Sequence, residues 1–224
     1  MNGSTRTAGA RVTRHAGIDR LFHWTMAAAL LTCLFTAFLP ILGWKFAWVT
    51  PHWIAGVVLS AAVLFHIVRA VLFQDFWSIV AGPRDAVSLW RSVRHALGQG
   101  GPPPLRAAKY TLAQKLFHKA ITAVVLVIAA SGLTMLSKID TIFWQRNPYW
   151  LGDADWGLVY TAHGLAAMTM ITLLMLHVYF ALRPEKWWIT RSMLLGWIPR
   201  ADYEAYHDPS RWPVPANEQP LKEP

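Results

Sequence analysis

Four stretches of the sequence contain no Asp, Glu, Lys or Arg, and each approaches or exceeds the length needed to cross a lipid bilayer. They cover residues 21–44, 46–68, 120–137 and 156–182. A transmembrane helix needs roughly 20 consecutive, predominantly apolar residues. The third stretch is short, but Leu116 and Phe117 can extend it, because the side chains of Lys115 and Lys119 can reach toward the head groups. The sequence therefore predicts four spans, at about residues 21–44, 46–74, 114–137 and 156–182.

The composition agrees with a chain whose solvent is largely lipid. Charged residues make up 15% of the 224 residues and the mean hydropathy is +0.30, whereas a soluble domain carries about 25% charged residues. The single cysteine, Cys33, excludes a disulfide framework, a Cys-based zinc site and an iron–sulfur cluster held by this chain alone. It also excludes covalent attachment of a c-type haem. We expect a four-span domain over residues 21–182, with short tails at residues 1–20 and 183–224.

The basic residues are distributed unevenly about the four predicted spans. Of the 21 Lys and Arg residues, only Lys45, Lys138 and Arg146 fall in the two connections on one side. The others lie in the two tails or between the second and third spans with their flanks. Cytoplasmic segments are enriched in Lys and Arg, so we expect both termini to be cytoplasmic. The net charge of +9 then reflects membrane topology and does not indicate nucleic-acid binding.

The long connection between the second and third spans contains an amphipathic segment over residues 84–97. Ala86, Trp90, Val93 and Leu97 share one helical face, and basic residues lie opposite. This pattern is typical of a short helix lying at the membrane interface, although an ordinary loop is the alternative. Because the chain has no sizeable soluble domain, any catalytic domain has to belong to a partner chain.

Histidines recur at a fixed spacing inside two of the predicted spans. His163 and His177 are fourteen residues apart in the fourth span, and His52 and His66 are fourteen apart in the second. Fourteen residues make about four helical turns and a rise of roughly 21 Å, so each pair lies on one helix face at two depths. An ionisable residue within a span marks a functional site by default. The second and fourth spans run in the same direction, which suits two haems at two depths, each held by two imidazoles.

The spacing assigns one of the two haem sites and leaves the other open. His52 and His163 begin their spans and would hold the haem at the outer face. At the inner face, His177 has three candidate partners of similar depth, and geometry does not choose among them: His23, His66 and His118. Gly56, Gly132 and Gly164 would let a macrocycle approach a helix closely, although glycines also serve helix packing.

The expected fold is therefore an all-α integral membrane four-helix bundle that binds two b-type haems and carries short interfacial cytoplasmic helices. A haem-free membrane anchor or a metal-ion transporter is the alternative of a different class. The uncharged spans contain no Asp or Glu that could join a metal or proton relay, which disfavours the transporter.

Several motifs resemble the cytochrome b (gamma) subunit of membrane-bound, quinone-linked formate dehydrogenases. Gly17 to Trp24, with the sequence Gly-Ile-Asp-Arg-Leu-Phe-His-Trp, is similar to the start of the family's first span. The other matching segments are Lys109-Tyr110 with Gln114-Lys115, His163 with His177, and the tail His207-Asp-Pro-Ser-Arg-Trp212. The resemblance extends to a wider family of four-helix di-haem cytochromes b, which includes hydrogenase and thiosulfate-reductase cytochromes and bacterial cytochrome b561.

The resemblance implies a set of cofactor-binding residues. It implies His52 and His163 as ligands of the outer haem iron, and His23 and His177 as ligands of the inner one. His66 stands where that family often has an apolar residue, so it is an alternative inner ligand or a pocket residue. The resemblance also implies a quinone pocket near the start of the third span. The candidate contacts there are Thr111 and Ala113, which replace Asn and Gly of the family, with Lys115 and His118.

The same resemblance implies a function in a complex of the bacterial inner membrane. A molybdenum or tungsten subunit would oxidise formate, and an iron–sulfur subunit would pass the electrons to the outer haem. This chain would carry them to quinone without oxidising formate itself, and the complex can form a higher oligomer. The rival functions are a cytochrome of a hydrogenase or another membrane oxidoreductase, and a self-contained cytochrome that oxidises quinol.

Overall fold

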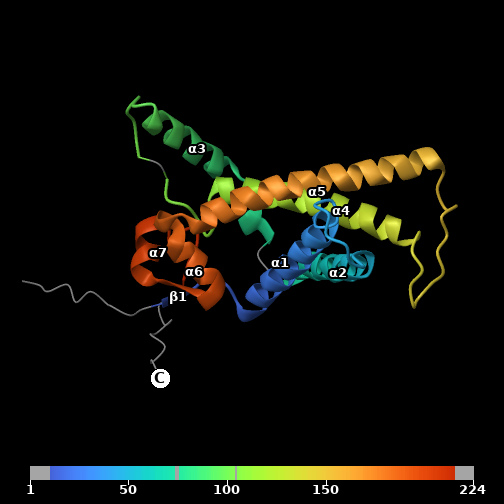
Figure 1. Ribbon diagram of the computed structural model, residues 1–224. Coiled ribbons are helices and arrows are strands. Elements are labelled where there is room, and N and C mark those ends of the chain that lie inside the picture. The colour runs from blue at the N-terminus through green and yellow to red at the C-terminus, as the bar shows by residue number, and fades with distance from the viewer. Residues whose placement is uncertain (1–10, 74–75, 104, 215–224) are drawn as a thin grey trace, which may run out of the picture. The chain divides into compact units, whose positions relative to one another are not determined.

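A computed structural model describes residues 11–73, 76–103 and 105–214 of the chain, and these residues are mostly helical (Figure 1). They fall into two compact units. Within the described residues, the helix unit comprises residues 21–73 and 118–179, and the tail unit comprises residues 11–20, 76–103, 105–117 and 180–214. The basic residues Arg6 and Lys222 and the predicted end of the second span at residue 74 lie outside the described residues.

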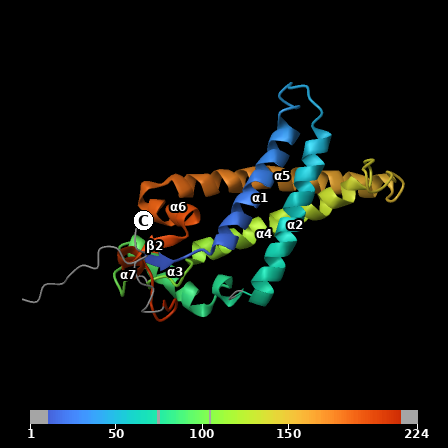
Figure 2. The ribbon, with the colours of Figure 1, turned by 90° about the horizontal axis from the view of Figure 1, so that it is seen from below.

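Four long helices correspond to the four predicted spans. They are α1 (Gly17–Phe38), α2 (Val49–Phe73), α4 (Leu112–Leu136) and α5 (Asp153–Leu182). All four are long and apolar enough to cross a membrane, which confirms the prediction of four spans in an all-α fold. In the two ribbon views α1 lies beside α2 and α4 lies beside α5 (Figures 1 and 2).

The first helix differs from its predicted span at both ends. It begins at Gly17 because charged residues are tolerated in a first turn, where the Asp19 carboxylate accepts a hydrogen bond from the Ala16 N–H at 3.3 Å. It ends at Phe38, whereas the prediction extended the span to residue 44. Gly43 has a left-handed φ of 94°, and this turn closes the helix although its residues are apolar. Hydropathy alone does not distinguish an apolar turn from an apolar helix.

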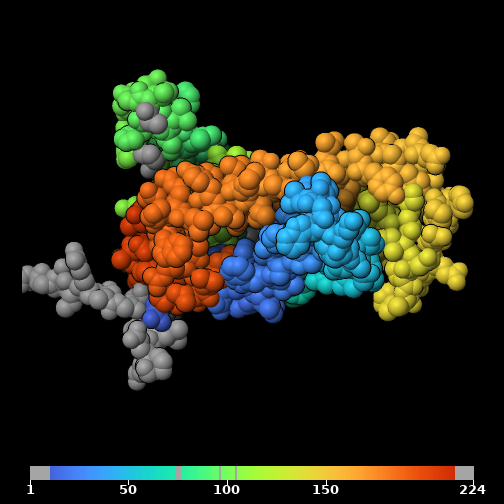
Figure 3. All heavy atoms as spheres, in the orientation of Figure 1, coloured from blue at the N-terminus to red at the C-terminus, as the bar shows by residue number. Residues whose placement is uncertain are grey.

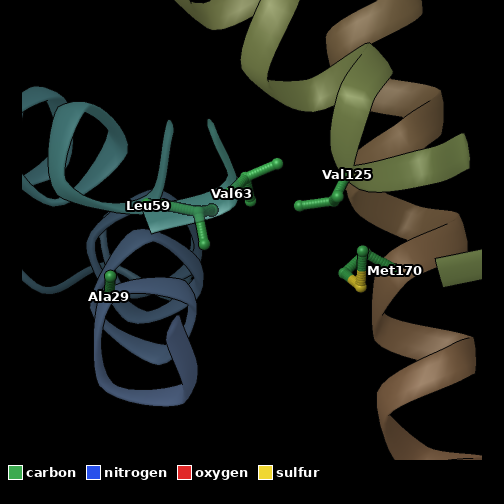
Figure 4. Close-up of a cluster of buried hydrophobic side chains, with 5 residues drawn as sticks. All are labelled: Ala29, Leu59, Val63, Val125 and Met170. Carbon is green, nitrogen blue, oxygen red and sulfur yellow. The ribbon is translucent and has the colours of Figure 1, made fainter. Parts of the chain in front are cut away.

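The core of the helix unit is small and takes residues from all four long helices. Figure 4 shows its buried members, Ala29, Leu59, Val63, Val125 and Met170. Large apolar side chains elsewhere on these helices are exposed, and atoms of α5 lie at the surface in the space-filling view (Figure 3). Leu165 of α5, for example, is 65% exposed. Such a surface is costly in water and is what a lipid solvent requires.

The tail unit contains a short antiparallel ribbon that the all-α prediction did not include. Strands β1 (Arg11–Thr13) and β2 (Trp197–Pro199) pair with Val12 opposite Ile198, and both of these side chains are fully buried. The pairing was not predicted because strands of three residues carry almost no periodic signal. The ribbon packs with two short helices, α6 (Trp187–Leu195) and α7 (Arg200–Tyr206), and the 3-10 turn η2 (Pro184–Lys186) contacts α6.

His207, from the tail motif, has a structural role in this unit. Its Nδ1 lies 2.7 Å from the Ala108 carbonyl oxygen, which can only accept, so Nδ1 carries the proton. Its Nε2 then accepts a hydrogen bond from the buried Arg14 guanidinium at 3.1 Å. Burial lowers the pKa of His207, and this keeps the ring neutral and able to accept. Through these hydrogen bonds, the histidine of the tail motif stabilises the fold of the tail unit.

The amphipathic segment predicted at residues 84–97 forms helix α3 (Pro83–Ala96), preceded by the 3-10 turn η1 (Phe76–Ile79). The prediction of a helix is confirmed. Proline at its first position is favourable there, and Asp85 accepts from the Gly82 N–H at 2.9 Å, which caps the helix. The side chains of Leu89, Trp90 and Val93 remain exposed, as an interfacial helix requires.

Asp85 also anchors α3 within the tail unit. Its carboxylate lies 2.9 Å from Lys115 Nζ and 3.2 Å from an Arg211 guanidinium nitrogen. Both Asp85 and Lys115 are buried. Burial raises the pKa of Asp85, but the hydrogen bonds from Gly82, Lys115 and Arg211 outweigh it and hold the pKa below its usual range. Asp85 is therefore ionised, and the ion pair fixes the rotation of α3.

We expect Asp85→Asn to release α3 from this anchor. Removing one partner leaves the Lys115 charge buried and uncompensated, which typically costs about 3–5 kcal/mol. Trypsin cleaves after Arg91 and Arg94 only when α3 opens, so its cleavage rate there, measured by mass spectrometry, should rise about tenfold or more. Glu204→Gln is the matched control, because it breaks an exposed ion pair with Arg200 that contributes little. Equal cleavage rates in the two variants would contradict the anchoring role of Asp85.

Candidate functional site

The structure brings together the two histidines predicted at the outer face. His52 of α2 and His163 of α5 oppose each other with ring centres 6.4 Å apart. Two imidazoles on opposite sides of one metal ion, each bound through a nitrogen about 2 Å from the metal, have ring centres about 6 Å apart. The separation therefore leaves room for one metal ion between the two rings.

The hydrogen bonds of His52 fix its tautomer. Its Nδ1 lies 3.1 Å from the Cys33 carbonyl oxygen and 3.0 Å from Thr36 Oγ1, both on α1. A carbonyl oxygen can only accept, and the Thr36 hydroxyl donates its own proton to the Thr32 carbonyl oxygen at 2.6 Å. Nδ1 is therefore the protonated nitrogen. The lone pair of His52 is on Nε2, which is the nitrogen left to bind a metal.

His163 on α5 makes the same kind of hydrogen bond, in its case to a residue of α4. Its Nδ1 lies 2.9 Å from Ser131 Oγ, and the Ser131 hydroxyl donates to the Val127 carbonyl oxygen. The serine oxygen therefore accepts from Nδ1–H, and the lone pair of His163 is on Nε2. Bonds of this kind from the second ring nitrogen orient metal-binding histidines in known sites.

Gly132, one of the three glycines expected beside a haem, allows α4 to approach His163 closely. A Cβ built at Gly132 would lie 3.2 Å from His163 Cε1, so a larger residue would push the ring away. A Cβ at Gly56 or Gly164 would meet no atom within 4 Å. The space beside these two glycines is open, which is compatible with a macrocycle there. Their role in cofactor packing stays a prediction.

A second pair of opposed rings joins α1 and α5. His23 and His177 have ring centres 6.3 Å apart, which is again the separation expected for two imidazoles on one metal ion. The Nδ1 atom of His23 is buried and makes no hydrogen bond to any described residue. Because His163 and His177 lie on one continuous helix, the two pairs are separated by roughly 21 Å along α5.

The other two candidates for the inner site face each other instead of His177. His66 of α2 and His118 of α4 have ring centres 6.1 Å apart. The Phe22 ring stacks on His66 at 4.7 Å with an angle of 12° between the planes. The separation of this third pair is close to those of the other two, so the choice of partner and not the distance separates His66 from His177. Sequence spacing had left His23, His66 and His118 as equal partners for His177.

Thr111 and Lys115, two of the four candidate quinone contacts, make hydrogen bonds within the tail unit. Thr111, Ala113 and Lys115 belong to the tail unit and His118 to the helix unit. Thr111 caps α4, because its N–H donates to Gln114 Oε1 at 2.9 Å and its Oγ1 accepts from the Gln114 N–H at 3.3 Å. Lys115 is engaged by Asp85 and by the Val80 carbonyl oxygen at 3.0 Å. Their contact with a quinone stays a prediction.

The paired imidazoles of the candidate site are a set of ligands that favours haem over a bare metal ion. Within the described part of the chain, no group of three or more His, Cys, Asp or Glu side chains could hold a metal ion. Protein sites for bare zinc use three or four such ligands, whereas haem iron takes four nitrogens from its macrocycle and needs only axial ligands from the protein. Opposed pairs of imidazoles therefore fit haem.

Sequence reasoning missed the residues that orient the histidines. Cys33, Thr36 and Ser131 were not among the candidates, because Ser and Thr in helices commonly bond a carbonyl of the preceding turn. Thr36 and Ser131 make that ordinary bond as well, so only the distance to a histidine on another helix shows their second role. The one signal in the sequence was the predicted depth of these residues in the membrane, which is close to that of His52 and His163.

Comparison with known protein families gives a match over most of the chain. The family model described as "Prokaryotic cytochrome b561" matches residues 14–196, a range that includes every histidine of the three pairs. None of the curated proteins matches this chain.

Proposed function

The chain belongs to the prokaryotic cytochrome b561 family, whose members bind haem b, and we propose that it holds two haems and passes electrons across the membrane to quinone. It is a multi-pass membrane protein of electron transfer. The number of haems, the direction of transfer and the partners belong to the proposal.

The observation that supports the proposal is that two of the three opposed imidazole pairs share α5, and so lie at two depths of one helix unit. The outer pair, His52 and His163, and the inner pair, His23 and His177, have nearly equal separations of 6.4 and 6.3 Å. When bound, each haem supplies an iron that takes up and releases one electron. Two histidines of this chain bound to one haem iron would leave it no position for oxygen, which would favour electron transfer over oxygen chemistry.

The protein positions the two cofactors relative to each other. His163 and His177 on α5 set an axial separation of roughly 21 Å, and His52 and His23 complete the pairs from α2 and α1. On the outer side, Thr36, Cys33 and Ser131 hold the imidazoles with Nε2 directed away from their hydrogen bonds. The rigid helices therefore hold both redox centres in place, so little reorganisation accompanies each electron.

The distribution of basic residues supports a direction. With both termini cytoplasmic, as the Lys and Arg distribution predicts, the pair formed by His52 and His163 lies toward the outer face and the pair with His177 toward the cytoplasm. An electron that crosses in this direction does electrical work of about 2.3 kcal/mol per 100 mV. The location in a bacterial inner membrane is part of this proposal.

For the electron donor, we propose an iron–sulfur subunit of a formate dehydrogenase, with a molybdenum or tungsten subunit that oxidises formate. The sequence motifs at Gly17–Trp24 and Lys109–Lys115 support this choice. Quinone would accept the electrons near the inner pair. The quinone contact that we favour is His118, the first residue of α4 that belongs to the helix unit. Thr111 and Lys115 already have hydrogen-bond or ion-pair partners within the tail unit.

The donor can be tested by purifying the tagged chain from its native membranes in a mild detergent. We expect an iron–sulfur subunit and a molybdenum or tungsten subunit to co-purify, and formate to reduce the haems. Reduction by hydrogen and not by formate would identify a hydrogenase as the partner. A chain that purifies alone and is reduced by quinol would be a self-contained quinol-oxidising cytochrome. Either of these results would overturn the formate dehydrogenase assignment.

A further inference from the structure

The two histidine pairs differ in what their Nδ1 atoms contact, and we infer that Ser131 and Thr36 hold the outer haem at a lower reduction potential than the inner haem. The inference rests on the proposed binding of two haems. Ser131 and Thr36 are positioning residues, since they would act on the cofactor only through His163 and His52.

The outer imidazoles both donate their Nδ1 protons to oxygen. His52 faces two acceptors, the Cys33 carbonyl oxygen at 3.1 Å and Thr36 Oγ1 at 3.0 Å, and His163 faces Ser131 Oγ at 2.9 Å. The hydroxyl protons of Thr36 and Ser131 are occupied by backbone carbonyl oxygens of their own helices. Neither hydroxyl is therefore free to rotate and donate to the ring.

The inner pair lacks this feature on at least one of its rings. His23 Nδ1 is buried and has no hydrogen-bond partner among the described residues. In residues 11–73, 76–103 and 105–214, no carbonyl or hydroxyl oxygen accepts a proton from His23 Nδ1 as Ser131 Oγ does from His163. The contrast between His163 and His23 is therefore one of hydrogen bonding, since both rings lie opposite another imidazole at nearly the same separation.

Hydrogen bonding at Nδ1 changes the electron density that an imidazole gives to a metal. A ring that donates its Nδ1 proton to oxygen is a more basic ligand through Nε2. A more basic axial ligand stabilises ferric iron relative to ferrous iron, which lowers the reduction potential. The outer haem is then the weaker electron acceptor. With His52 and His163 on the outer haem and His23 and His177 on the inner one, transfer of one electron from the outer to the inner haem would make or break no bond and would be favourable before the membrane potential is counted.

The test is a redox titration of Ser131→Ala with the haem absorbance as readout. We expect the lower of the two midpoint potentials to rise. At a fixed applied potential the ratio of reduced to oxidised haem should change threefold to tenfold, which corresponds to a shift in midpoint potential of about 30–60 mV for one electron. Ser131→Thr keeps the hydroxyl and should restore the original value. Thr134→Val is the matched control, because Thr134 makes the same backbone bond on α4 and contacts no histidine in the described structure.

A second set of variants keeps the inference testable if Ser131→Ala does not fold. Thr36→Val should also raise the lower potential, by less, because the Cys33 carbonyl oxygen still accepts from His52. His23→Ala, which should retain only the outer haem, should display the lower of the two wild-type potentials. If two haems bind but the outer one has the higher potential, or Ser131→Ala and Thr36→Val shift neither, the inference is wrong and the proposed function stands. A chain without haem would overturn both.

Discussion

Replacing His163 with alanine is expected to reduce the haem content of the purified protein from two haems per chain to one. His163 supplies one of the two imidazoles of the outer pair, 6.4 Å from its partner ring, and an iron with only one axial histidine in this apolar site is poorly held. His52→Ala should have the same effect. The measurement is the haem-to-protein ratio, together with the disappearance of one of two potentials in a redox titration.

The control for the outer pair is His95→Ala, which removes an exposed histidine of α3 and should leave two haems. The double variant His52→Ala with His163→Ala should lose no more haem than either single variant, because both act on one cofactor. If His163→Ala and His52→Ala each lose a different haem, the two rings do not share an iron and the outer pair is wrongly assigned.

Replacing His23 with alanine is expected to remove the inner haem, whereas His66→Ala should leave both haems bound. The structure places the His23 ring 6.3 Å from His177, while His66 faces His118 and stacks on Phe22. His177→Ala should match His23→Ala in haem content and in the potential that remains. The haem-to-protein ratio of the four variants, measured after the same purification, tests the pairing.

His118→Ala serves as the control for the inner pair, because it removes the ring that faces His66 and should also leave two haems. The sequence spacing alone allowed His66 or His118 as the partner of His177, so this series decides among all three. A variant of His66 that loses a haem while the His23 variant keeps both would show that the inner pairing proposed here is wrong.

The sequence predicted most of the helical architecture because lipid imposes a strong and simple constraint. Apolar runs without charge had to form helices, since backbone polar groups in a bilayer have no water to bind. The amphipathic pattern over residues 84–97 likewise predicted α3. The bounds were less accurate, because the turn that ends α1 is as apolar as the helix before it.

The contacts between helices could not be predicted to the same degree. Periodicity places His163 and His177 on one face of α5, but it does not say which helix faces them. His23, His66 and His118 have similar depths, and only the packing of α1 and α4 separates them. The bonds from Ser131 and Thr36 to the histidines, and the pairing of Val12 with Ile198, also depend on residues far apart in the chain.

Lys115 shows which contacts a local motif does not predict. Its place beside Thr111 at the start of a span, and the resemblance to a quinone-linked family, suggested a contact with quinone. The structure shows a buried ammonium group 2.9 Å from Asp85, thirty residues earlier in the chain. A buried charge of this kind needs a partner, and the partner could not be identified from either segment alone.

The central claim is that one chain holds two b-type haems between four histidines, and haem quantification of the purified chain tests it most directly. The pigment should be extracted with alkaline pyridine, its reduced spectrum recorded, and its amount divided by that of the 25.2 kDa chain. We predict two haems b per chain, with an absorption band of the reduced protein that is typical of b-type cytochromes. A chain that purifies folded with one haem, or with none, would contradict the account.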